Sequence, residues 1–194
     1  VSGSKDFGSL NKLKSEAAAE IAGMLTWAAL HSGDRVGLLL FAGEVEKIIP
    51  PRKGKQQVAR MIREILGHKS KSQGTNLTAA LDAAGRVMKH SGVVFVISDF
   101  IAEGYGTAIR RLARRHDVIA VSVADLRESE VPDVGRILIG DPEMPGSEGE
   151  RWVDTGSYVF KQWLESQKKK RAEVRNEAFR GGEVDLLEVH TRED

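Results

Sequence analysis

The stretch GVVFVISDF (92–100) decides the fold, because an apolar run there ends abruptly in Ser98 and Asp99. Short runs of this kind, rich in β-branched residues, are typical of strands that are covered on both faces. Such strands belong to parallel sheets flanked by helices, and these sheets bind ligands at the carboxyl ends of their strands. The sequence therefore predicts a buried strand with Asp99 at the ligand-binding edge of a sheet.

Strands and helices alternate along the rest of the chain. Further strands are predicted at 35–42, 44–50, 117–125 and 184–191, and the first two form an antiparallel edge hairpin that Pro50-Pro51 ends. Apolar residues at three- and four-residue spacing predict helices at about 10–32, 55–66, 77–90, 105–115 and 157–178. A turn-rich segment predicts a small hairpin excursion at about 134–154. The alternation predicts a doubly wound, mostly parallel, Rossmann-like α/β sheet.

Size and composition narrow the class of protein. A chain of 194 residues fits one domain, and its net charge of +1 favours neither a nucleic-acid nor a membrane partner. The absence of cysteine excludes disulfides and thiolate metal sites and fits a reducing compartment. No apolar run reaches the about 18–20 residues of a membrane span, and no signal peptide is recognisable. We expect a cytoplasmic domain.

Three polar clusters fall at loops where a sheet of this kind would bind a ligand. Ser2 and Ser4 precede the first helix, Thr75 precedes the 77–90 helix, and Asp99 follows the 92–98 strand. Hydroxyl and carboxylate oxygens suit a hard cation such as Mg²⁺, which takes few protein ligands and keeps several waters. Taken alone, Ser2 and Ser4 are more typical of a helix cap or a turn than of a metal site, and Thr75 and Asp99 are each compatible with a helix N-cap. Together, in this order, they favour a metal site whose ligands neutralise only part of the cation's charge.

These loops resemble the metal-ion-dependent adhesion site of the von Willebrand factor A (vWA) domain. That family has an Asp-x-Ser-x-Ser loop after its first strand, a threonine on a second loop and an aspartate on a third. Val1-Ser2-Gly3-Ser4 matches all but the leading aspartate, and Gly74-Thr75-Asn76-Leu77 matches the threonine loop. Ile97-Ser98-Asp99-Phe100 matches the aspartate loop, although the family more often has glycine where Phe100 stands.

Longer stretches are similar to one bacterial subgroup, the domain-of-unknown-function family 58. The likeness covers nearly the whole chain and includes DRVGLLLFAGEVEKIIP (34–50), GTNLTAALDAAGRV (74–87), VVFVISDF (93–100) and RRLARRHDVIAVSVAD (110–125). The resemblance implies a single vWA-like domain over 1–194 that lacks its first strand. We therefore expect residues before Val1 in the natural protein, forming a strand between those at 35–42 and 92–98 and ending in the missing aspartate. Four buried aliphatic residues of such a strand represent about 6–12 kcal/mol of burial.

The resemblance also implies a function. Ser2, Ser4, Thr75 and Asp99 would hold Mg²⁺ or Mn²⁺ weakly in this chain, an acidic side chain of a protein partner would complete the coordination, and Asn76 and Phe100 would flank the docking surface. The implied role is non-enzymatic: assembly or activation of protein complexes together with an AAA+ ATPase. Many members carry membrane-spanning helices ahead of the domain, which implies that the full-length protein is membrane-anchored.

Two alternatives stay open. The first is a metal-dependent hydrolase, for which Asp6 and Glu103 are the nearest candidate bases, and the second is a structural domain whose metal site has decayed.

Other conspicuous residues have plainer interpretations. The basic runs HKSKSQ (68–73) and KKKR (168–171) are interpreted as a solvated loop and a solvated helix face, not as nucleic-acid contacts. Phe160 and Trp163 are predicted to be core residues, and Trp152 is either part of its hairpin's packing or an exposed contact. The pair His116-Asp117 resembles a dipeptide of phosphohydrolases, but it lacks partner histidines. We attribute the likeness to chance.

Overall fold

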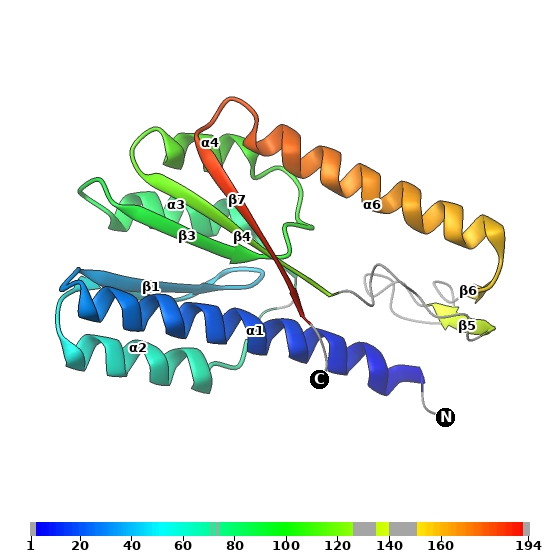
Figure 1. Ribbon diagram of the computed structural model, residues 1–194, viewed down its shortest axis with the longest axis horizontal. Helices are drawn as coiled ribbons and strands as arrows, with labels where there is room; N and C mark the ends of the chain where they lie inside the picture. The colour runs from blue at the N-terminus through cyan, green and yellow to red at the C-terminus, as the bar shows by residue number, and fades with distance from the viewer. Residues whose placement is uncertain (1–2, 71, 73, 126–134, 140–150, 192–194) are drawn as a thin grey trace.

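The computed structural model describes residues 3–70, 72, 74–125, 135–139 and 151–191 (Figure 1). The first half contains α1 (Gly3–His31), β1 (Val36–Phe41), β2 (Val45–Arg52), α2 (Lys55–Gly67), α3 (Leu77–Val87) and β3 (Val93–Ser98). The second half contains α4 (Gly106–Ala113), β4 (Asp117–Asp125), β5 (Arg136–Ile139), β6 (Arg151–Asp154), α6 (Tyr158–Phe179) and β7 (Val184–Thr191).

The strands form a parallel sheet and two antiparallel hairpins. The parallel sheet has the order β3-β4-β7, while β1 pairs with β2 and β5 pairs with β6. Helices α3, α4 and α6 lie on one side of the molecule, and α1 and α2 lie on the other (Figure 1). This arrangement confirms the predicted Rossmann-like α/β class, and the hairpin expected at 134–154 is seen as β5 and β6.

The sequence predicts a further strand between β1 and β3. These two strands belong to separate sheets, and no ladder joins them among the residues that the structure describes. Phe41, at the end of β1, nevertheless packs against the same buried cluster as Val96 of β3. The upstream strand stays a prediction.

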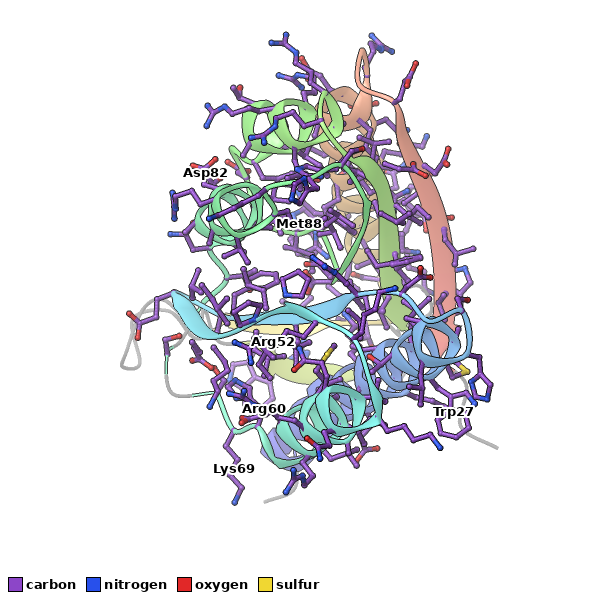
Figure 2. All side chains as sticks on the ribbon, turned by 90° about the vertical axis from the view of Figure 1, so that its left-hand side faces the viewer. Trp27, Arg52, Arg60, Lys69, Asp82 and Met88 are labelled. Atoms are coloured by element: carbon purple, nitrogen blue, oxygen red, sulfur yellow. The ribbon has the colours of Figure 1, made fainter. Side chains whose placement is uncertain are left out.

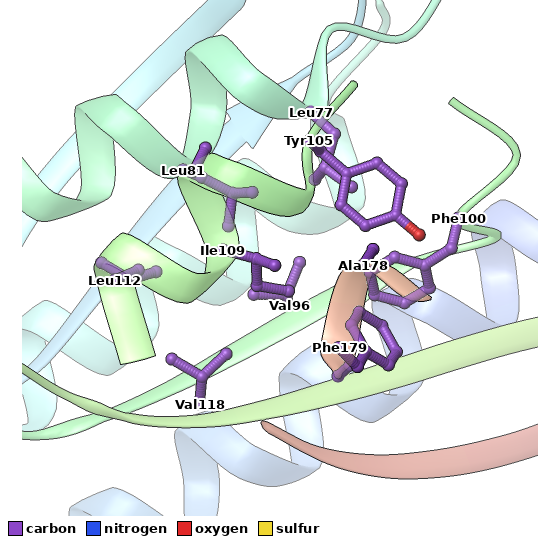
Figure 3. Close-up of a cluster of buried hydrophobic side chains, with 12 residues drawn as sticks. Leu77, Leu81, Val96, Phe100, Tyr105, Ile109, Leu112, Val118, Ala178 and Phe179 are labelled. Atoms are coloured by element: carbon purple, nitrogen blue, oxygen red, sulfur yellow. The ribbon is translucent and has the colours of Figure 1, made fainter. Parts of the chain in front are cut away.

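The main core fills the space between the parallel sheet and the helices above it. Its largest fully buried members include Tyr105, Leu77, Ile109 and Val118, which come from the start of α3, the start and middle of α4, and β4 (Figure 3). The cluster also takes in Phe179 at the end of α6. This packing fixes the positions of the loops that follow β1 and β3.

Three predicted boundaries were wrong. Helix α1 begins at Gly3 instead of about 10, because extending an existing helix costs far less than starting one. Strand β2 runs through Pro50-Pro51 to Arg52. Among the described residues β2 pairs with β1 alone, and an edge strand tolerates proline because its outer N–H groups join no second ladder. Helix α3 ends at Val87, three residues earlier than predicted.

Several apolar residues expected in the interior are exposed. In β3, Val93 and Phe95 are 51% and 41% exposed, because alternate residues of the strand point away from the main core and α1 covers β4 more than β3. Phe160 is buried as predicted, but Trp163 is 53% exposed, so its assignment to the core was wrong. Trp152, for which the sequence allowed either packing within its hairpin or exposure, is exposed.

The 68–73 loop is more ordered than a purely solvated loop. The Glu46 carboxylate, whose side chain is 4% exposed, accepts hydrogen bonds from His68 Nε2, from the Ser70 hydroxyl, and from both the backbone N–H and the hydroxyl of Ser72. One buried carboxylate of β2 therefore holds three residues of this loop, between positions 68 and 72. Residues 71 and 73 lie outside the described part. Within the described part of the chain, no helix has both the length and the apolar character needed to cross a membrane.

Candidate functional site

The loop that carries Thr75 is tied to the end of β1. The backbone N–H of Asn76 donates to the carbonyl of Ala42 at 2.7 Å, one residue past the strand. The Asn76 side chain accepts from the N–H of Ala79 at 3.0 Å and so caps α3. Thr75 is therefore not the helix cap. Its side chain is exposed, and its hydroxyl makes no hydrogen bond to any described residue.

The second loop places Asp99 directly after β3. One oxygen of its carboxylate accepts from the N–H of Ile101 at 3.3 Å, forming a local turn, while the N-cap position of α4 belongs to Tyr105. Asp99 is therefore exposed and not a helix cap. The neighbouring Ser98 hydroxyl accepts from the N–H of Phe100 at 3.2 Å. A carboxylate oxygen thus stays available at the rim.

Phe100 holds this loop in an unusual backbone conformation. Its φ is +53°, a region that glycine adopts freely and other residues rarely. The ring is 3% exposed and packs against Phe179 edge-on at 5.4 Å between centroids and against Tyr105 at 5.8 Å. Phe100 therefore faces the core, and the expectation that it flanks a docking surface was wrong. Glycine would adopt this φ without the steric cost of a Cβ.

The Thr75 and Asp99 loops are both anchored in one buried cluster. Leu77, two residues after Thr75, and Phe100, directly after Asp99, both belong to the main core, and Phe41 packs against it. Figure 3 shows Leu77 and Phe100 on either side of Tyr105. The Thr75 loop precedes α3 and is bonded to Ala42 just past β1, and the Asp99 loop follows β3; we call these two loops the strand-end rim.

The first serine loop is not brought to this rim as a loop. Ser2 lies outside the described residues, and Ser4 lies in the first turn of α1, so its expected place in a loop before the helix was wrong. The backbone alone locates Ser4, because nothing describes its side chain.

The chemistry of the rim fits a hard cation only in part. Thr75 and Asp99 offer one hydroxyl and one carboxylate, which are oxygen ligands of the kind that Mg²⁺ and Mn²⁺ accept. Among the described residues, no three His, Cys, Asp or Glu side chains gather in a way that would hold a metal ion. Thr75 and Asp99 alone would be too few ligands for such an ion.

The sequence did not indicate a row of polar residues that lies beside the rim. Ser98, Ser122 and Glu188 are aligned across β3, β4 and β7. Arg175 of α6 donates to the Ser122 hydroxyl at 3.3 Å and forms an ion pair with Glu188. Burial raises the pKa of the nearby Tyr105 phenol, and the positive charge of Arg175 partly opposes this rise. The only sequence signal for this network was a polar residue near the end of each strand.

A family model described as "Protein of unknown function DUF58" matches residues 1–174. The chain belongs to this family. Uncharacterized proteins of Mycobacterium tuberculosis and Mycobacterium bovis are 33% identical to the DUF58 chain over 146 residues, which cover 74% of this chain and 46% of each relative. The DUF58 chain thus spans about half the length of these curated relatives.

One solved structure supports the fold. A conserved hypothetical protein, BatB from Bacteroides thetaiotaomicron, is 16% identical, with a TM-score of 0.57 over 92% of this chain and 80% of that one. An aerotolerance-related membrane protein from Bacteroides fragilis, solved with multiple mutations to serines, gives a TM-score of 0.46 at 16% identity over 82% of this chain and 87% of that one. The likeness to BatB supports the α/β architecture described above.

Proposed function

We propose that this DUF58 chain is a non-enzymatic protein-interaction module that works through a Mg²⁺ or Mn²⁺ ion at the strand-end rim. One observation carries the proposal: the exposed Thr75 hydroxyl and Asp99 carboxylate stand on two loops fixed by the same buried cluster, and neither side chain caps a helix. Ser2, Ser4 and an aspartate upstream of Val1 would supply the remaining protein oxygens.

The electrostatics of such a site favour an acidic partner. One carboxylate and a few hydroxyls leave a divalent cation incompletely neutralised, because a hydroxyl ligand carries no formal charge. A carboxylate from another protein would add both a ligand and the missing negative charge. The resemblance to the vWA domain supports this mode of binding. The likeness to the bacterial subgroup supports an AAA+ ATPase as the partner, in the assembly or activation of other complexes. Segments outside this chain would provide any membrane anchor.

Calorimetric titration with MgCl₂ and MnCl₂ tests the cation site. The chain as given should bind weakly, and a chain extended upstream by its natural residues should bind in the micromolar-to-millimolar range. Asp99→Ala should abolish the heat of binding, and Thr75→Val should weaken it, because each removes a ligand. The matched control is Glu103→Ala, which removes another exposed acidic side chain near the same loop and should leave the affinity unchanged.

Two further measurements separate the proposed role from its alternatives. A pull-down of a purified AAA+ ATPase from the same organism should succeed with Mg²⁺ and fail with a chelator or with Asp99→Ala. Hydrolysis of phosphate esters that disappears with Asp99→Ala would identify a metal-dependent hydrolase and overturn the non-enzymatic role. Absence of metal binding by the extended chain would leave a structural domain.

A further inference from the structure

A small pocket lies between α3 and α4, at the end of the parallel sheet opposite to the strand-end rim. It has a volume of about 250 Å³ and is lined by Asp82 and Arg86 of α3, Arg111 of α4, and Arg115 and His116 of the turn that follows. His116 directly precedes β4, and the N–H of Asp117 donates to the carbonyl of Gly92 just before β3. The pocket therefore lies at the amino ends of these strands, away from Thr75 and Asp99.

The charged side chains around the pocket are unbalanced. Three guanidinium groups face a single carboxylate, which leaves a formal surplus of two positive charges. Arg111 Nη1 donates to Asp82 Oδ1 at 3.0 Å, so this one pair is satisfied. Arg86 and Arg115 make no hydrogen bond or ion pair with any residue the structure describes. Two guanidinium groups, with their planar sets of donors, are thus available to a ligand.

His116 forms the buried part of the same pocket. The residue is 4% exposed, and neither of its ring nitrogens has a hydrogen-bond partner in the described part of the molecule. Leaving buried polar atoms unpaired is costly, and such groups normally meet a protein group, a water molecule or a ligand. Burial and the positive charge of Arg115 both lower the pKa of His116. The neutral imidazole then offers one N–H donor to whatever enters the pocket.

We infer that this pocket binds a phosphate-type oxyanion, either free phosphate or a small phosphate monoester. Arg86 and Arg115 would bind it at the mouth, and an N–H of His116 would bind it from below. A dianion matches the surplus of two positive charges, and its oxygens can accept hydrogen bonds from several directions at once. The pocket is smaller than the about 300–1,000 Å³ usual for drug-sized ligands, so a phosphoryl group fits better than a nucleotide.

Binding should change the ionisation of His116. The groups that face it around the pocket are Asp82, Arg86, Arg111 and Arg115, and together they oppose a positive charge on the ring. A bound dianion reverses this balance and favours the imidazolium form, so the pKa of His116 should rise. This readout is specific to an anion beside the ring. It does not depend on the proposed metal ion, which lies at the other end of the sheet.

Calorimetric titration with sodium phosphate, at constant ionic strength and in a phosphate-free buffer, tests the inference. The double variant Arg86→Gln, Arg115→Gln should weaken binding at least about tenfold, because each charge-assisted hydrogen bond contributes about that factor or more. The control is Arg60→Gln, an exposed arginine on α2, across the β1–β2 hairpin from Asp82 (Figure 2). It should leave the affinity unchanged. NMR titration should show an upward shift in the pKa of His116 when phosphate is present.

The choice of anion separates the possible outcomes. Binding of phosphate or of O-phosphoserine supports the site, and their relative affinities distinguish a free phosphate from a monoester. Acetate should bind much more weakly. Equal binding of acetate, an equal loss in Arg60→Gln, an unmoved pKa of His116, or no binding at millimolar phosphate would each overturn the inference.

Discussion

The backbone at Phe100 allows a sharp test of how the core positions Asp99. Phe100 combines a buried ring with a φ of +53°, so two energetic terms act at one residue. Replacing it with alanine removes the ring and keeps a Cβ in the unfavourable region. Replacing it with glycine removes the ring and relieves the backbone. The difference between the two variants therefore isolates the backbone term.

The magnitudes follow from the packing and the dihedral angle. Loss of the ring from its contacts with Tyr105 and Phe179 should cost both variants about 3–5 kcal/mol of the free energy of unfolding. In the alanine variant, a Cβ in the left-handed region costs about 1–2 kcal/mol of stability. The glycine variant avoids this cost but loses about 0.5–1 kcal/mol, because glycine has more freedom in the unfolded chain. Phe100→Gly should thus be more stable than Phe100→Ala by about 0.5–1 kcal/mol.

Urea unfolding followed by far-ultraviolet circular dichroism measures the difference. The matched control is Phe160, a buried phenylalanine in the first turn of helix α6, where alanine should be more stable than glycine by about 1 kcal/mol. The two positions should therefore give opposite orders of stability. If Phe100→Ala is as stable as Phe100→Gly, or more stable, the strained loop described here is wrong.

Three other predictions concern the rest of the molecule. Glu46→Gln should lower the free energy of unfolding by about 1–3 kcal/mol in the same urea assay, because the buried carboxylate accepts several hydrogen bonds from the 68–72 loop; an unchanged stability would contradict this. The native tryptophan emission should already lie close to that of the unfolded chain and be readily quenched by acrylamide, since all three tryptophans are more than half exposed: Trp27, Trp152 and Trp163. A chain extended upstream by its natural residues should show slower hydrogen exchange at the free edges of β1 and β3, and unchanged exchange would argue against a strand between them.

The sequence predicted the strands and helices well because their signals are local. The β-branched run at 93–97 and the three- and four-residue spacing of the helices depend only on nearby residues. The parallel sheet and the antiparallel hairpins followed from the alternation of these elements and from their short connections. Predicted ends were less accurate, as at Pro50-Pro51, because whether a proline is tolerated depends on the absence of a neighbouring strand, which is a tertiary property.

Burial was harder to predict than the elements. Trp163 has the spacing of a core residue on α6, but the helix extends beyond the sheet and leaves the ring half exposed (Figure 1). Phe95 lies in the most apolar strand, and one of its faces is incompletely covered. His116 looked accidental because its neighbours in the pocket come from α3 and α4, and no sequence spacing brings Arg86 beside it.

The sequence placed Asp99 directly after a buried strand, and the structure shows which residues hold the loop that carries it. Asp99 is exposed while the next residue, Phe100, is buried and has a positive φ. The packing of Phe100 against Tyr105 and Phe179 therefore sets the direction in which the carboxylate leaves the sheet. Because Tyr105 also separates Leu77 from Phe100, the same ring links this loop to the one that carries Thr75 (Figure 3). A substitution at Tyr105 would thus displace both proposed ligands without removing either. The positions of Thr75 and Asp99 therefore depend on the packing of the core beneath them.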